Sequence, residues 1–313
     1  MLVNADSVLA NPLNSGVDAQ VKMSAPALFI LIPLAAKWQL SDEVDFLEYI
    51  EARIQDVPSK RWYPLFGNKA PIRTVNDGKE TDLVVTYDDG SIAFIRNGTI
   101  TRTFITNKGG MAYTQFLLSI NRLNNYGFIE VDKFNNIIRR VNPDGSLSAL
   151  KPNACYAATP DPAGLKDEYR SGFVLNYTVE EYVQNGQILY STESLLDLMG
   201  LVNATPVNPT ATTTQLTFGI QTIGSQTDLI AALTQSGGAP NPWALISNFV
   251  VTNAAGTVIT PTAAAIVNGN VVLTIPTQAV DNILTIGLAP AATLAANGIS
   301  GYEGTQTVNV TIP

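Results

Sequence analysis

The chain has 313 residues, of which 14 % are charged and 46 % are hydrophobic, with a net charge of −8 and a pI near 4.6. This composition excludes disorder driven by charge, favours a weakly charged β-rich chain with room for two domains, and provides no basic surplus for nucleic-acid binding, sequence-specific or otherwise. Because the sequence contains no His, Ser-His and Cys-His catalysis and the commonest metal ligand are excluded as well.

The chain begins with a polar segment that is followed by a short apolar run. Residues 1–24 are Asn-rich and lack periodicity, and we assign residues 1–36 to an N-terminal arm of the first domain. Residues 25–36 are apolar, but a spanning helix needs about 20 apolar residues, so no membrane span is expected. Asp6 and Asp18 precede the run and argue against a cleaved signal. We expect a buried strand, or an arm packed on a neighbouring subunit.

Two main helices are predicted in the first domain. Ser41 is suited to cap a helix that ends at Pro58, with one face formed by Val44, Leu47, Ile50 and Ile54. A second helix is predicted for residues 111–124, with an apolar stripe of Tyr113, Phe116, Leu117, Ile120 and Leu123.

Strand and turn patterns dominate the rest of the first domain. Residues 83–106 predict a three-stranded meander that turns at Asp88–Ser91 and again at Arg96–Gly98. Further strands are predicted at residues 128–131 and 137–141, and a turn at residues 142–145. Residues 151–170 are rich in Pro, Asp and Gly, so we expect a long loop there.

The end of the first domain is less regular. A strand is predicted at residues 173–177. Residues 182–190 fit a hairpin around Asn185-Gly186, whereas residues 178–181 match a helix capping box; we prefer the hairpin. Residues 194–199 predict a short helix that Gly200 closes, and residues 203–210 read as a Pro-containing linker. We therefore place the boundary between residues 202 and 203.

The last third of the chain has an unusual charge distribution. Its only charged residues are Asp228, Asp281 and Glu303, whereas all 18 Lys and Arg precede residue 203. Alternating apolar residues predict half-buried strands, in the sets Leu216, Phe218 and Ile220; Val271, Leu273 and Ile275; Leu284, Ile286 and Leu288; and Val308, Val310 and Ile312. Turns are predicted at Asn253–Gly256 and Asn268-Gly269. The pattern indicates an all-β sandwich of about 100 residues.

The end of this region carries a family resemblance. Residues 295–302, which lead into residues 305–312, resemble the last loop and final strand of bacterial Ig-like domains on surface and phage proteins. The resemblance implies an Ig-like β-sandwich for residues 203–313, appended to an α+β, β-rich domain at residues 1–202. This domain order is similar to that of the major tail (tube) proteins of long-tailed phages. In that family the first domain forms stacked rings through sheet augmentation and the Ig-like domain projects outward.

Few residues suggest chemistry. Asp88-Asp89 and Glu180-Glu181 are acidic pairs, but adjacent carboxylates point apart in turns and strands, so we expect turn and surface roles rather than glycoside hydrolysis or Ca²⁺ binding. Cys155 is the single cysteine, and an inert thiol in a loop is favoured over a reactive or intersubunit one. Lys60–Tyr63 combines cations with aromatic rings, yet a packed loop is favoured over a stacking site.

Four triplets match glycosylation sequons, which we ascribe to the Asn- and Thr-rich composition; they begin at Asn97, Asn176, Asn203 and Asn309. We expect no catalytic, cofactor or metal site. The favoured function is a structural subunit of a homo-oligomeric virion assembly, such as a phage tail tube, made in the bacterial host cytoplasm with further copies and other virion proteins as partners. A capsid or head decoration protein is the alternative, as is a surface adhesin that binds carbohydrate through the Ig-like domain. An acidic-residue glycosidase ranks last.

Overall fold

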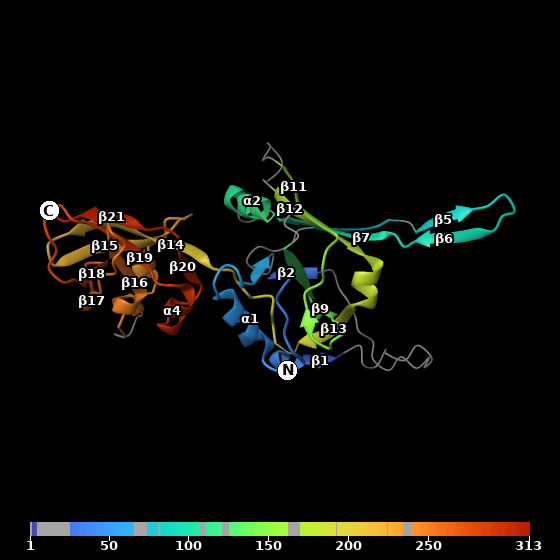
Figure 1. The fold of residues 1–313 in the computed structure, drawn as a ribbon, viewed down its shortest axis with the longest axis horizontal. Helices are drawn as coiled ribbons and strands as arrows, with labels where there is room; N and C mark the ends of the chain where they lie inside the picture. Colours follow the sequence, from blue (N-terminus) through green and yellow to red (C-terminus); the bar gives the residue numbers. More distant parts are fainter. Residues whose placement is uncertain are drawn as a thin grey trace. The chain divides into compact units, whose positions relative to one another are not determined.

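The computed structural model describes residues 2–4, 26–65, 74–80, 82–106, 110–120, 125–161, 170–191, 193–223, 225–233 and 240–313. The chain is β-rich with few helices, and its strands form several sheets (Figure 1). It divides into two compact units, the first with residues 1–54 and 58–200 and the second with residues 55–57 and 201–313. Each unit is described by itself below.

The described residues of the first unit form three antiparallel sheets. The seven-stranded sheet has the order β1 (Leu2–Asn4), β13 (Gly186–Ser191), β9 (Asn136–Val141), β8 (Tyr126–Asp132), β2 (Pro26–Pro33) and β3 (Tyr63–Leu65), with β10 (Leu147–Ser148) also on β9. The four-stranded sheet has the order β11 (Ala154–Asp161), β12 (Arg170–Thr178), β7 (Thr99–Thr106) and β4 (Thr74–Lys79). The third sheet is the hairpin β5 (Leu83–Thr86) and β6 (Ile92–Arg96).

The apolar run near the N-terminus is a buried strand. Every residue from Leu28 to Ile32 is at most 1 % exposed in β2, which lies between β8 and β3. The predicted strand is confirmed, but the proposed cover by a neighbouring subunit is wrong, because this chain covers both faces of the strand by itself. The arm interpretation also fails for residues 2–4, which pair with β13. Residues 5–25 lie outside the described residues.

The helices of the first unit differ in detail from the prediction. The one expected from Ser41 is divided into a 3-10 turn, η2 (Leu40–Glu43), and the helix α1 (Phe46–Ile54). Its buried face is formed by Phe46, Ile50 and Ile54, whereas Val44 is 60 % exposed. Glu43, at the end of η2, has a buried side chain that accepts hydrogen bonds from Trp38 and Arg139. The second predicted helix is α2 (Gly110–Ser119), and residues 121–124 lie outside the described part.

The predicted meander at residues 83–106 is wrong in its last pairing. β5 and β6 form the expected hairpin, but β7 does not pair with β6. Instead β7 pairs with β4 on one edge and with β12 on the other, so no edge remains for β6. Residues 97–98 therefore connect two sheets.

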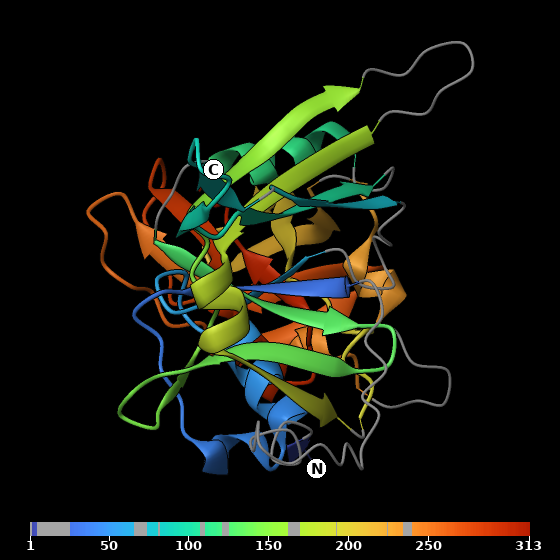
Figure 2. The same cartoon turned by 90° about the vertical axis from the view of Figure 1, so that its right-hand side faces the viewer.

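Three other predictions about the first unit are also corrected. The loop expected at residues 151–170 contains β11, which pairs with β12, and residues 162–169 lie outside the described residues. The preferred hairpin at residues 182–190 is wrong, because residues 180–184 form the helical turn η3 (Glu180–Gln184) before β13. This turn leads from the four-stranded to the seven-stranded sheet (Figure 2). Residues 194–199 form a turn and not a helix.

The second unit is a pair of sheets around one core. One sheet has the order β17 (Ala263–Val267), β18 (Asn270–Thr274), β15 (Gln215–Thr222), β14 (Val202–Ala211) and β20 (Tyr302–Gly304). The other has the order β16 (Phe249–Asn253), β19 (Ile283–Leu288) and β21 (Val308–Thr311). Short helical segments complete the unit: α3 (Leu229–Ala232), η4 (Pro242–Ala244), η5 (Ile246–Asn248) and α4 (Ala291–Ala296).

Most of the predicted pattern of the second unit is confirmed. Leu216, Phe218 and Leu273 are at most 1 % exposed in its core, although Val310 is only partly buried. The hairpin at Asn268-Gly269 has φ values of 50° and 76°, as a primed turn requires. The expected linker at residues 203–210 is wrong, because this segment belongs to β14, which pairs with β15 and β20.

Candidate functional site

The hairpin of β5 and β6 extends away from the rest of the first unit (Figure 1). We call residues 82–98 the projecting arm. Its large apolar side chains are between 39 % and 67 % exposed, and they are Leu83, Val84, Val85, Tyr87, Ile92, Phe94 and Ile95. An isolated two-stranded hairpin is marginally stable in water, so the arm is expected to need a cover.

Both faces of the projecting arm are apolar. Val84 pairs with Phe94, and Thr86 pairs with Ile92, which places these side chains on one face because strand residues alternate. Val85 pairs with Ala93 on the other face, beside Leu83 and Tyr87. A surface hairpin of a monomer usually has one polar face, and this arm has none.

The exposed apolar area of the arm is divided between its two faces. At roughly 100 Å² per side chain the seven side chains present about 700 Å² in total, or roughly 350 Å² on each face, which is comparable with the largest apolar patch of a typical soluble monomer. A standard protein–protein interface takes about 800 Å² from each partner. One face of the arm thus supplies a little under half of one side of such an interface, and a partner that covers both faces would take up most of it.

Polar contacts hold the base of the projecting arm. Glu80 accepts hydrogen bonds from Arg96 and from the hydroxyl of Thr99, both at 3.2 Å. The amide of Gly98 donates to Asp82 at 2.9 Å. A Cβ added to Gly98 would overlap the carbonyl oxygen of Glu80, so only glycine fits there. The arm therefore leaves the sheet in a defined direction.

The acidic pair Asp88-Asp89 lies in the turn at the tip of the arm, as predicted. Asp89 accepts hydrogen bonds from the amide and the hydroxyl of Ser91, at 2.8 and 2.6 Å, which lower the pKa of its carboxyl group. Gly90 has a φ of 79°. The Asp89 carboxylate serves the turn, and the acidic pair shows no arrangement for general acid-base catalysis.

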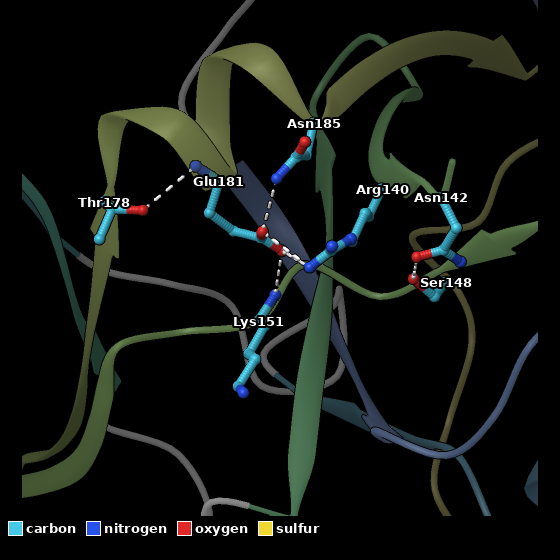
Figure 3. Close-up of polar contacts among 7 residues, drawn as sticks. All are labelled: Arg140, Asn142, Ser148, Lys151, Thr178, Glu181 and Asn185. Carbon is cyan, nitrogen blue, oxygen red and sulfur yellow. Dashed lines mark hydrogen bonds and ion pairs between the residues drawn. The ribbon is translucent and has the colours of Figure 1, made fainter. Parts of the chain in front are cut away.

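The two residues of the second acidic pair, Glu180 and Glu181, have different environments. Glu180 is exposed, but Glu181 is buried, so the expected surface role is wrong for Glu181. Its carboxylate accepts hydrogen bonds from Arg140 at 2.9 Å, from the amide of Lys151 at 2.8 Å and from Asn185 at 3.0 Å (Figure 3). The Glu181 amide in turn donates to the hydroxyl of Thr178.

A shallow recess of about 350 Å³ lies beside this cluster, lined by Lys151, Pro152, Asn153, Thr178 and Glu181. Because the Glu181 carboxylate already accepts bonds from several donors, its negative charge is compensated within the chain. The cluster joins η3 to β9 and to the segment that precedes β11.

Two further buried ionic groups connect elements of the first unit. Arg139 and Glu43, both 1 % exposed, form a bidentate pair at 2.6 and 3.0 Å. In the other group the Tyr182 hydroxyl donates to Glu130 and accepts from Arg102 at 2.6 Å. Burial, and then the charge of Glu130, raise the pKa of Tyr182 well above its usual value. Both groups connect separate elements of the first unit through buried hydrogen bonds, so we assign them structural roles.

The other residues considered from the sequence have ordinary environments. Cys155 is a buried residue of β11 and does not lie in the expected loop. Within Lys60–Tyr63 the Trp62 ring is 2 % exposed and packs on Trp38, so the predicted packed segment is confirmed. Of the sequon residues, Asn97 and Asn203 are exposed, Asn176 accepts a bond from Thr101, and Asn309 accepts one from Thr285.

Within the described ranges, no group of three or more His, Cys, Asp or Glu side chains is arranged to hold a metal ion. Among the helices of the same residues, none has the length and apolar character needed to cross a membrane.

Comparisons with known proteins give little further information. No family model matches the chain, and no curated protein matches it. Among solved structures, the chain is similar to the N-terminal part of the bacterial S-layer protein SbsC, with 12 % identity and a TM-score of 0.23. The match covers 36 % of this chain and 24 % of that one. At this level the similarity supports no functional argument.

Proposed function

We propose that the chain is a structural subunit of a homo-oligomeric virion assembly, in the role of a phage tail tube or major tail protein. The observation that carries the proposal is the projecting arm, whose two apolar faces are uncovered in a single copy. Exposed apolar strands drive association, and closed symmetric assembly is the usual way in which proteins prevent this from becoming open aggregation. The partner is a second copy of the chain, and the protein is not an enzyme.

The second unit is proposed to be an Ig-like domain that projects from the particle. Its two sheets, its length of roughly 110 residues and its alternating core strands support this assignment. Residues 203–313 contain three charged residues, which leaves a surface of small polar groups that tolerates close neighbours without electrostatic repulsion.

The test measures the mass of the purified chain by light scattering over a wide concentration range, and its shape by negative-stain microscopy. We expect assemblies that form tubes or stacked rings. Closed shells would indicate a capsid protein and not a tail protein. A monomer at every concentration would refute the proposed assembly function.

A matched pair of substitutions tests whether the projecting arm is the assembly interface. Ile92→Asp places a charge on the arm at a side chain that is 67 % exposed, and Val258→Asp does the same in the second unit at 63 % exposure. We expect Ile92→Asp to abolish assembly and Val258→Asp to leave it intact, with both variants folded by circular dichroism. Equal assembly of both variants would show that the arm is not the interface.

A further inference from the structure

The outer face of α2 carries two large apolar side chains that are exposed in the first unit. Met111 and Leu118, which are seven residues apart and therefore on the same side of the helix, are 73 % and 49 % exposed. The opposite side packs on β11 and β12, where Leu117 is fully buried. α2 has no charged residue, although a surface helix normally turns a charged face to water. Gln115 and Ser119 are also exposed on this helix, but neither carries a charge, so Met111 and Leu118 stand in water without a charged neighbour on α2.

The projecting arm of one copy cannot provide that cover for its own α2. The arm joins β7 at Thr99, whereas α2 follows the other end of β7 at Thr106. The eight residues of β7 span roughly 26 Å, and the base of the arm directs it away from the sheet (Figure 1). The two apolar surfaces thus lie at opposite ends of one strand.

We infer that the arm of one copy docks on the outer face of α2 of the next copy, in a head-to-tail interface. The inference rests on the proposed assembly function and names the two surfaces that meet. Symmetric pairing of two arms would cover one apolar face of each arm and would leave α2 uncovered. Arm-to-α2 contact brings these two surfaces together, and neither contributes a charged side chain to the contact apart from the ends of the arm.

A head-to-tail interface has a definite consequence for assembly. Each copy carries one arm and one acceptor, so growth continues until a ring closes or a helical filament forms. Symmetric arm pairing would stop at a dimer. A copy that lacks a functional arm still has an acceptor, and it would end a growing chain.

The experiment mixes two full-length variants with complementary defects. The first is Phe94→Asp, which disables the arm at a side chain that is 59 % exposed. The second is Leu118→Asp, which disables the acceptor. Each variant alone should be a monomer by light scattering, and the equimolar mixture should give a heterodimer with twice the monomer mass and no larger species. Val258→Asp, outside both surfaces, is the control and should assemble like the unmodified chain.

The outcomes separate the inference from the proposed function. If the unmodified chain assembles but the mixture yields no heterodimer, or if Leu118→Asp assembles normally, arm-to-α2 docking is wrong while the assembly function stands. If the unmodified chain never assembles, the proposed function itself fails. Should Leu118→Asp unfold, the milder Leu118→Ser keeps the test valid. Adding Phe94→Asp to the unmodified chain should also shorten its assemblies in proportion to the amount added.

Discussion

Replacing Glu43 by Gln should destabilise the first unit strongly. The carboxylate is 1 % exposed and accepts two bonds from Arg139 and one from Trp38, at distances from 2.6 to 3.0 Å. The substitution keeps the shape but leaves the Arg139 guanidinium, also 1 % exposed, without its counter-charge. Breaking one partner of a buried ion pair costs about 3–5 kcal/mol. The matched control is Lys37→Met, which breaks the exposed Lys37–Asp144 pair and should cost far less, because solvent screens the two charges.

The assay is urea unfolding followed by tryptophan fluorescence in a Trp243→Phe background, in which Trp38 and Trp62 report on the first unit alone. The free energies of unfolding of the variants are compared by linear extrapolation. The double variant Glu43→Leu/Arg139→Met, which removes both buried charges, should recover part of the loss. If Glu43→Gln and Lys37→Met lower the free energy equally, burial does not set the strength of these ion pairs and the reasoning is refuted.

Three other outcomes are expected. A fragment of residues 201–313 should unfold cooperatively in denaturant, and a non-cooperative transition would argue against an independent second unit. In this fragment Leu273→Ala, at a fully buried position, should lower the free energy of unfolding by about 2–5 kcal/mol. Gly98→Ala should force the base of the arm apart, because the added Cβ would overlap the carbonyl oxygen of Glu80, and hydrogen exchange of the arm amides should become faster. The midpoint of thermal unfolding of the second unit should not change. Unchanged exchange of the arm amides would contradict the tight fit at Glu80. The pKa of Tyr182 is raised in the fold, so its contribution to stability is fully present below the unfolded tyrosine pKa near 10 and is lost as the pH rises further. Thermal midpoints measured across the alkaline range should therefore fall with pH. This fall should be smaller in Tyr182→Phe.

Local patterns in the sequence were sufficient where the physical cause is local. The alternation in β15 and β18 follows from the two-residue period of a strand, and the turn at Asn268-Gly269 follows from the need for positive φ. The continuous apolar run of β2 likewise predicts a strand with both faces covered.

The candidate site was not predictable in this way. Leu83–Val85 has the apolar, β-branched character of a core strand, and nothing in these residues distinguishes a buried strand from an exposed one. Exposure was decided by β4 and β12, which occupy both edges of β7 and leave β5 and β6 paired only with each other. Strand pairing joins residues far apart in the chain, so a local pattern cannot reveal it.

The same distinction applies to the buried charges. An acidic pair such as Glu180-Glu181 has one sequence signature whether it faces solvent or the interior, and we expected the surface. In the structure Glu181 lies in the helical turn η3 and not in the expected hairpin, and its carboxylate accepts a hydrogen bond from Arg140. The sequence by itself determined that the chain is β-rich, weakly charged and without histidine chemistry. Only the tertiary structure decided which apolar strands remain uncovered and which carboxylates are paired inside, because both depend on contacts between distant segments.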